Sequence, residues 1–174
     1  MSDPHCDAAP SAWVARFASL VPRGGTVLDL AAGAGRHSRL FLERGYRIVA
    51  ADRDTAALAG LPAQDRLEIV TADLEGGQPW PLPGRRFAGV VVTNYLYRPL
   101  LPVIVGAVAP GGVLIYETFA AGNERFGKPS NPDFLLRPGE LLEAVHGRLH
   151  VIAYEDLEIA APRRAMVQRI AAIG

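Results

Sequence analysis

The residues best suited to bind a ligand lie in the segment LDLAAGAGRHS, residues 28–38. The apolar, β-branched run before Asp29 is typical of a buried strand, and the residues after Gly35 are typical of a helix that ends near Gly45. Gly33 and Gly35 therefore lie in a strand-to-helix turn, where a backbone without Cβ atoms lets a ligand approach closely. This arrangement predicts a binding site for a nucleotide-like molecule.

Polar side chains end the following apolar runs in the same way. Asp52 ends YRIVAAD, Asp73 ends RLEIVTAD, and Asn94 with Tyr95 follows RFAGVVVT. A single aspartate at a strand end commonly caps a turn or the next helix. Together with Asp29, however, aspartates end three successive strands, and strand ends of one parallel sheet converge on one crevice. We therefore expect a ligand site there.

The position of Asp52 narrows the choice of ligand. It lies seventeen residues after Gly35, where a carboxylate can accept hydrogen bonds from both hydroxyls of a ribose. NAD fits this feature as well, but Ser38 stands where a dinucleotide fingerprint has its third glycine, and the chain has no spare length for a second substrate region. Asp73 and Leu74 suit an adenine, whose amine needs an acceptor and whose face needs an apolar neighbour. An adenosine-containing cofactor other than NAD is therefore favoured.

The elements that must position these residues alternate between strand and helix, which predicts an α/β fold with a doubly wound, mostly parallel sheet. Residues 75–84 contain three prolines and three glycines and are predicted to form a loop. The last two strands have no helix between them, so they should form a C-terminal antiparallel hairpin that turns at Pro162. Seven strands are expected, over 26–31, 46–52, 66–73, 86–94, 111–119, 149–159 and 164–173, with helices over 11–21, 37–45, 54–60, 98–108 and 138–147.

Length and composition set further limits. The 174 residues are expected to form a single domain, residues 1–174, with a loose lead-in over 1–10. No apolar run reaches the roughly 18 residues of a membrane span, the N-terminus does not resemble a signal peptide, and Cys6 is the only cysteine, so a cytoplasmic location is expected. The formal net charge is zero, which gives no electrostatic signal for nucleic acid. A monomer or weak dimer is expected. No metal site is predicted from His5, Cys6, His146 and His150.

Three segments of the chain are similar to motifs of the class I S-adenosylmethionine-dependent methyltransferases. VLDLAAGAGRHSRLF resembles their first motif, and AADRD and TADLEG resemble the second and third. The resemblance extends over nearly the whole chain and implies a Rossmann-like fold and S-adenosylmethionine as cofactor. The layout is most similar to small bacterial enzymes of the tellurite-resistance or thiopurine methyltransferase type. The resemblance implies that the cofactor is bound by Asp29, Ala31, Gly33, Gly35, Arg36, Asp52, Arg53, Asp73, Leu74 and Asn94.

Several residues near these motifs have two possible roles. Trp13 and Arg16 could close over the carboxylate of the cofactor, although Trp13 fits an apolar helix face equally well. His37 could act as a general base, but its position in the first turn of a helix favours packing or capping.

The methyl acceptor should enter beside the end of the fourth strand. The sequence TNYLYRP there lacks the Asn-Pro-Pro-aromatic run of many enzymes that methylate amino groups in DNA and protein, and Asn94, Tyr95 and Tyr97 are the catalytic candidates. The polar insert over 120–133, just after the fifth strand, is predicted to be a lid, with a solvated spacer as the alternative. Substrate-binding residues are expected at Glu117, Asn123, Lys128 and Asn131, with Arg125 beside them.

These observations predict a methyltransferase that uses S-adenosylmethionine and acts on a small molecule or a soft nucleophile, such as a thiol or a metalloid oxyanion. Two alternatives stay open. The first is a methyltransferase acting on RNA or protein. The second is an NAD(P)-binding or other nucleotide-binding protein without methyl transfer.

Overall fold

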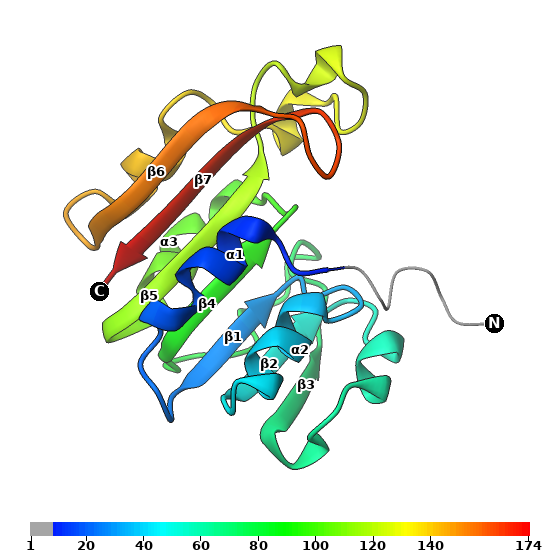
Figure 1. The fold of residues 1–174 in the computed structure, drawn as a ribbon, viewed down its shortest axis with the longest axis vertical. Helices are drawn as coiled ribbons and strands as arrows, with labels where there is room; N and C mark the ends of the chain where they lie inside the picture. The colour runs from blue at the N-terminus through cyan, green and yellow to red at the C-terminus, as the bar shows by residue number, and fades with distance from the viewer. Residues whose placement is uncertain (1–8) are drawn as a thin grey trace.

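The computed structural model of this chain describes residues 9–174. His5, Cys6 and most of the expected lead-in lie outside the described residues. The chain forms one seven-stranded sheet in the order β3-β2-β1-β4-β5-β7-β6 (Figure 1). The first five strands along the chain pair in parallel, and β7 pairs antiparallel with both β5 and β6, which confirms the predicted terminal hairpin. The strands are Thr26–Leu30 (β1), Arg47–Asp52 (β2), Leu67–Thr71 (β3), Phe87–Thr93 (β4), Val108–Phe119 (β5), His150–Ile159 (β6) and Ala165–Ile173 (β7).

The helices are shorter than the sequence predicts. The segment 98–108 begins with a 3-10 turn and becomes α-helical only afterwards, and Pro102 is tolerated because the first helical turn needs no donor from its nitrogen. The predicted helix over 54–60 is a 3-10 turn over Ala56–Gly60. The α-helices are Ala12–Phe17 (α1), Arg36–Glu43 (α2), Leu101–Gly106 (α3) and Glu140–Val145 (α4).

Side chains of the central strands alternate between two apolar cores, one on each face of the sheet. On one face, Val27 and Ile48 pack with residues of α1 and α2. On the other face, Leu28 and Val49 pack with residues of α3 and α4. Figure 1 shows α1 and α2 in front of the sheet and α3 behind it. The sheet is therefore doubly wound, as predicted.

The carboxyl ends of β1, β2, β4 and β5 lie at one edge of the sheet. Leu30 is in register with both Ala51 and Val92, and Thr93 with Glu117. Residues 72–86 start at the same edge after β3 and run to the beginning of β4 without forming a helix or strand, as their prolines and glycines predict. No helix within residues 9–174 is long and apolar enough to cross a bilayer.

Candidate functional site

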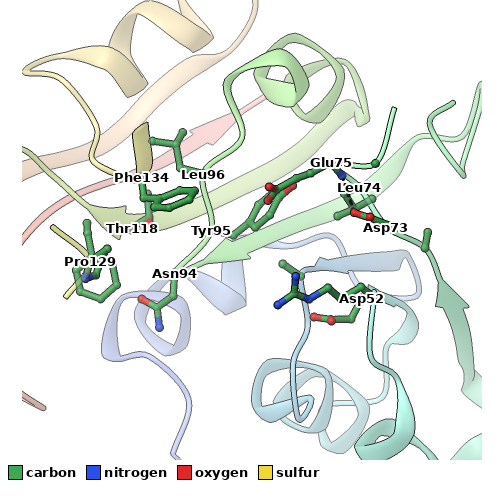
Figure 2. A pocket seen from close by; sticks show the side chains of 15 residues that line it. Asp52, Asp73, Leu74, Glu75, Asn94, Tyr95, Leu96, Thr118, Pro129 and Phe134 are labelled. Carbon is green, nitrogen blue, oxygen red and sulfur yellow. Dashed lines mark hydrogen bonds between the residues drawn. The ribbon is translucent and has the colours of Figure 1, made fainter. Parts of the chain in front are cut away.

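A cavity of about 710 Å³ lies at this edge of the sheet (Figure 2). It contains the ends of β2, β4 and β5, the loop after β3 and part of the insert after β5. Its wall includes many of the residues that the sequence assigns to a cofactor or to catalysis: Ala31, Asp52, Arg53, Asp73, Leu74, Asn94 and Tyr95. The remaining lining residues, which the sequence did not single out as binding residues, are Ala72, Glu75, Gly76, Leu96, Thr118, Phe119, Pro129 and Phe134.

The glycine turn after β1 places Gly33 and Gly35 in different surroundings. Both have left-handed backbone, with φ of 55° and 80°. A Cβ atom on Gly33 would meet nothing within 4 Å, so this glycine borders open space. A Cβ atom on Gly35 would lie 2.7 Å from Leu61 Cδ1 and 2.8 Å from Leu58 Cδ2. Gly35 is therefore required by packing against these leucines, whereas Gly33 leaves room for a ligand.

Asp52 joins the end of β2 to the glycine turn. Its Oδ2 accepts a hydrogen bond from Gly33 N at 2.8 Å, and its Oδ1 accepts one from Asp54 N at 3.0 Å. These contacts fix the carboxylate at the cavity wall, and each oxygen retains a second lone pair for a ligand hydroxyl. Asp52 therefore caps a turn and also lines the cavity, so its capping contacts leave it available to a ligand.

Asp73 has a similar arrangement at the end of the next strand. Its Oδ1 accepts a hydrogen bond from Glu75 N at 3.0 Å. Gly76 follows so closely that a Cβ atom there would lie 2.7 Å from Asp73 Oδ2. The loop after β3 thus wraps around this carboxylate and places Leu74 beside it in the cavity wall.

Asp29 has a structural role in place of the predicted contact with the cofactor. Its side chain is buried, and its Oδ2 accepts hydrogen bonds from Ser38 N at 2.9 Å and Ser38 Oγ at 2.6 Å. It therefore fixes the first turn of α2 to β1, and it does not line the cavity. Burial raises the pKa of the Asp29 carboxyl to about 7, against the lowering effect of the Ser38 hydrogen bonds and of Arg36.

Replacing Asp29 by asparagine should flatten the pH dependence of stability. Because the folded-state pKa is raised, the native state holds this proton more tightly than the unfolded chain, so stability is lost as the pH rises from about 4 to about 7. An asparagine amide can still accept from Ser38 N but cannot ionise. The free energy of unfolding in urea should fall less between pH 5 and pH 8 in Asp29→Asn than in the wild type. In Asp65→Asn, which changes an exposed aspartate, it should fall as much as in the wild type. Equal losses in all three proteins would contradict this assignment.

His37 is buried in the contact between α2 and the segment before α1. Its Nε2 accepts a hydrogen bond from Ser11 N at 3.1 Å, so its Nδ1 carries the proton and can donate to Thr93 Oγ1 at 3.4 Å. Burial, reinforced by Arg36, lowers the pKa of His37 to about 3. The ring is therefore neutral at physiological pH and has the packing role that its position in the helix predicts.

The residues after β4 lie in the middle of the cavity. Asn94 has left-handed backbone, with φ of 53°, and is exposed in the wall. Tyr95 lies between Asn94 and Glu75 in Figure 2, and its hydroxyl oxygen is buried without a hydrogen-bond partner within the described residues. A buried hydroxyl of this kind is a candidate for a ligand contact. Tyr97 does not line the cavity.

Several other predicted residues point elsewhere. The carboxylate of Glu117 accepts from Ser11 Oγ at 2.7 Å and pairs with Arg169 at 3.0 Å, and its neighbour Thr118 lines the cavity in its place. Trp13 is buried and donates to Ile170 O, so it belongs to the core. Arg16 is exposed beside the rings of Trp13 and Phe17, and Arg36 donates to Ala9 O; neither lines the cavity.

The insert borders the cavity through residues other than those predicted. Asn123 is buried: its Nδ2 donates to Pro129 O at 2.9 Å and its Oδ1 accepts from Met166 N at 3.2 Å. Asn131 caps the following 3-10 turn by accepting from Asp133 N. Lys128 and Arg125 are exposed and do not line the cavity, whereas Pro129 and Phe134 do. Asn123 and Asn131 therefore support the fold of this region, and the cavity is bordered by Pro129 of the insert and by Phe134 just after it.

Comparisons with known proteins agree with this geometry at the level of the fold. No protein-family model matches the sequence, and neither does any curated protein. Among solved structures, TehB from Haemophilus influenzae has a TM-score of 0.73 at 17% identity, over 96% of this chain and 63% of TehB, so the chain spans less than two thirds of that protein. The 1,6-didemethyltoxoflavin-N1-methyltransferase of Burkholderia thailandensis, solved with 1,6-didemethyltoxoflavin and S-adenosylhomocysteine, has a TM-score of 0.68 at 20% identity, over 94% and 76% of the two chains.

A third structure aligns over both chains in full. The glycopeptide N-methyltransferase MtfA, solved with S-adenosylmethionine, has a TM-score of 0.62 at 22% identity, and the alignment covers 100% of both chains. The sheet order, the terminal hairpin and these likenesses establish one conclusion: the chain has the fold of the class I S-adenosylmethionine-dependent methyltransferases.

Proposed function

We propose that this protein is a methyltransferase that uses S-adenosylmethionine and acts on a small molecule. The observation that carries the proposal is the Asp52 carboxylate, which Gly33 N fixes in the wall of a cavity at the carboxyl edge of the sheet. In doubly wound folds this edge is where nucleotide-like ligands bind. The bound S-adenosyl compounds in the similar structures of MtfA and the toxoflavin methyltransferase support the same assignment.

The residues of the cavity fit the cofactor. Asp52 has free lone pairs for the two ribose hydroxyls, Asp73 can accept from the adenine amine, and Leu74 can pack on the ring. Gly33 and Ala31 leave the space beside the turn free for the amino-acid portion. The volume of about 710 Å³ lies within the range of about 300–1,000 Å³ typical of small-molecule sites.

The chemistry requires orientation more than acid–base catalysis. When bound, the cofactor supplies a methyl group activated by a sulfonium; the bond between carbon and sulfur breaks with its electrons left on sulfur, while a lone pair of the acceptor forms the new bond. Asp52 and the glycine turn would hold the donor in line, and Asn94 and Tyr95, which line the same cavity, would border the acceptor. A proton carried by the acceptor nucleophile would leave to solvent.

A small-molecule acceptor is favoured over RNA or protein. The chain has 18 basic and 18 acidic residues, so it has no excess positive charge for binding phosphate backbones. The described wall of the cavity contains three carboxylates and one guanidinium, a balance that would repel a phosphate. The toxoflavin methyltransferase provides a similar structure with a small molecule bound.

Calorimetry tests the cofactor directly. We expect S-adenosylhomocysteine to bind the purified chain with a dissociation constant in the micromolar range, and NAD to give no binding heat. Incubation with methyl-tritiated S-adenosylmethionine and cell extract should label the small-molecule fraction rather than the RNA or protein fraction. Binding of NAD without S-adenosylhomocysteine would contradict the proposal, and label confined to RNA or protein would favour a methyltransferase that acts on RNA or protein.

A further inference from the structure

The cavity has two ends of opposite character. Figure 2 shows Asp52, Asp73 and Glu75 at one end and Leu96, Phe134 and Pro129 at the other, with Asn94 and Tyr95 between them. We call the second end the apolar end and define it by Leu96, Thr118, Phe119, Pro129 and Phe134. If the acidic end holds the adenosine portion of a cofactor, the apolar end is the part of the cavity that is left for the methyl acceptor.

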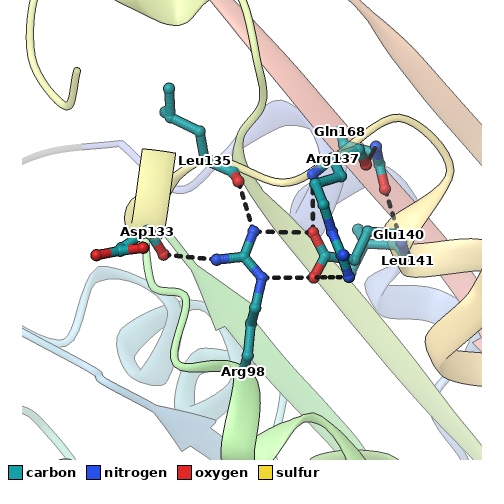
Figure 3. Close-up of polar contacts among 7 residues, drawn as sticks. All are labelled: Arg98, Asp133, Leu135, Arg137, Glu140, Leu141 and Gln168. Atoms are coloured by element: carbon teal, nitrogen blue, oxygen red, sulfur yellow. Dashed lines mark hydrogen bonds and ion pairs between the residues drawn. The ribbon is translucent and has the colours of Figure 1, made fainter. Parts of the chain in front are cut away.

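Phe134 is the most exposed aromatic side chain of the apolar end. It is 47% exposed although it lines the cavity. The backbone on both sides of it is held by Arg98, which donates from Nη1 to Asp133 O at 2.9 Å and from Nη2 to Leu135 O at 2.8 Å (Figure 3). The position of this segment is thus fixed although its ring is open to solvent, as expected for a ring that is covered by a ligand.

Pro129 and Phe119, two further residues of the apolar end, are fixed by separate contacts. Pro129 O accepts a hydrogen bond from the buried side chain of Asn123. The guanidinium of Arg163, in the turn between β6 and β7, lies 5.1 Å from the ring of Phe119 and donates to Lys128 O at 3.2 Å. Both segments that form the apolar end, the one around Phe134 and the one around Pro129, are therefore held in place by contacts to other parts of the chain, and we call this preformed region the apolar slot.

Charge determines what this slot can accept. Within residues 9–174, no ionisable side chain lines the apolar end, so no group in its wall can remove a proton from the acceptor. The Arg163 guanidinium contacts the Phe119 ring and Lys128 O and is not itself part of the wall. The acidic end contributes three carboxylates (Asp52, Asp73 and Glu75) against the single guanidinium of Arg53. An anionic acceptor would face this excess negative charge across the cavity.

We propose that the apolar end binds the methyl acceptor and that the acceptor is an uncharged molecule with a flat aromatic group, which packs against Phe134. This proposal deepens the proposed methyltransferase function and rests on it. Aromatic groups pack favourably on Phe and Pro side chains in such preformed slots. Thr118 and Asn94 supply the polar groups that would orient the acceptor atom toward the cofactor end.

A pair of probes with the same ring system tests the proposal. We expect 2-naphthol to bind the protein saturated with S-adenosylhomocysteine, and naphthalene-2-sulfonate, which adds a negative charge, to bind at least about tenfold more weakly. Phe134→Ala should weaken 2-naphthol binding about tenfold and leave S-adenosylhomocysteine affinity within about twofold, because Phe134 lies at the other end. Leu142→Ala removes an apolar side chain of α4, 38% exposed, that does not line the cavity, and should change neither affinity.

The outcomes separate this inference from the proposed function. Failure of S-adenosylhomocysteine to bind would refute the proposed function. If 2-naphthol still bound and its binding still depended on Phe134, the apolar end would be a binding site for aromatic molecules without that function. Binding of S-adenosylhomocysteine with no binding of 2-naphthol, with equal binding of the sulfonate, or with no effect of Phe134→Ala would overturn the aromatic acceptor.

Discussion

Asp52→Ala is expected to weaken binding of S-adenosylmethionine by about 30- to 150-fold, a loss of roughly 2–3 kcal/mol. Two effects contribute. The ribose hydroxyls lose a charged acceptor pair, and Gly33 N loses the carboxylate that holds the glycine turn at 2.8 Å. Calorimetry with S-adenosylmethionine and S-adenosylhomocysteine measures the loss.

Two further variants separate these effects. Asp52→Asn retains one oxygen that can accept from Gly33 N but lacks the charge and the second acceptor, so it should fall between the wild type and Asp52→Ala. Asp65→Ala removes an exposed aspartate that precedes β3, at the opposite edge of the sheet, and does not line the cavity, so it should bind normally. Unchanged affinity in Asp52→Ala would remove the central support for the cofactor assignment.

The fold could be predicted from the sequence because its pattern is repeated along the chain. Each central strand is an apolar run with one turn-forming segment after it, and the lack of a helix between the last two runs predicts the hairpin that the structure contains. Helix lengths were less predictable. The segments 54–60 and 98–108 have the apolar spacing of an α-helix, but the first contains only a 3-10 turn and the second begins with one. Over a few residues the two kinds of helix give a similar spacing, so the sequence does not separate them.

The sequence predicts where the cavity lies, but not which side chain at each strand end lines it. Strand ends locate the cavity, but adjacent residues of a strand face opposite sides, so Glu117 pairs with Arg169 while Thr118 lines the wall. Asp29 resembles a ligand-binding acid in sequence, and its use by Ser38, nine residues further on, depends on how α2 packs on β1.

The insert shows the same limit. Its polar composition indicates contact with solvent or a ligand, yet both side-chain atoms of Asn123 bind backbone groups, Pro129 O of the insert itself and Met166 N of β7. The cavity is lined instead by Pro129 of the insert and by Phe134 just after it, whose apolar character gave no signal of a binding role. Long-range contacts of this kind cannot be read from local pattern.

Glu140→Ala is expected to destabilise the fold by about 3 kcal/mol, because it breaks a largely buried ion pair. The Glu140 side chain is 4% exposed, and its carboxylate accepts from Arg98 Nε at 2.7 Å, Arg98 Nη2 at 3.0 Å and Arg137 N at 2.7 Å (Figure 3). Removing it leaves the Arg98 guanidinium with two backbone carbonyls and no counter-charge. Urea unfolding at pH 7 measures the loss.

An exposed pair with similar geometry provides the control. Arg85 and Glu68 also form two hydrogen bonds, at 2.7 and 3.0 Å, but their side chains are 39% and 51% exposed. Glu68→Ala should therefore cost less than about 1 kcal/mol. Equal losses of unfolding free energy in Glu140→Ala and Glu68→Ala would show that burial does not determine how much the Glu140 ion pair stabilises the fold.

The pH dependence gives a second measurement of the Glu140 pair. Burial alone would raise the pKa of Glu140, but the hydrogen bonds from Arg98 and Arg137 outweigh it, and the pKa lies below its usual value of 4.5. A depressed carboxyl pKa stabilises the fold above the unfolded-state value, and this stabilisation is lost as the pH falls through the folded-state value. The difference in unfolding free energy between wild type and Glu140→Ala should thus be constant above about pH 5 and shrink toward pH 3.

Because Arg98 also holds the carbonyls beside Phe134, hydrogen exchange over residues 131–136 should become faster in the variant. Unchanged exchange there would mean that the segment is held independently of Glu140.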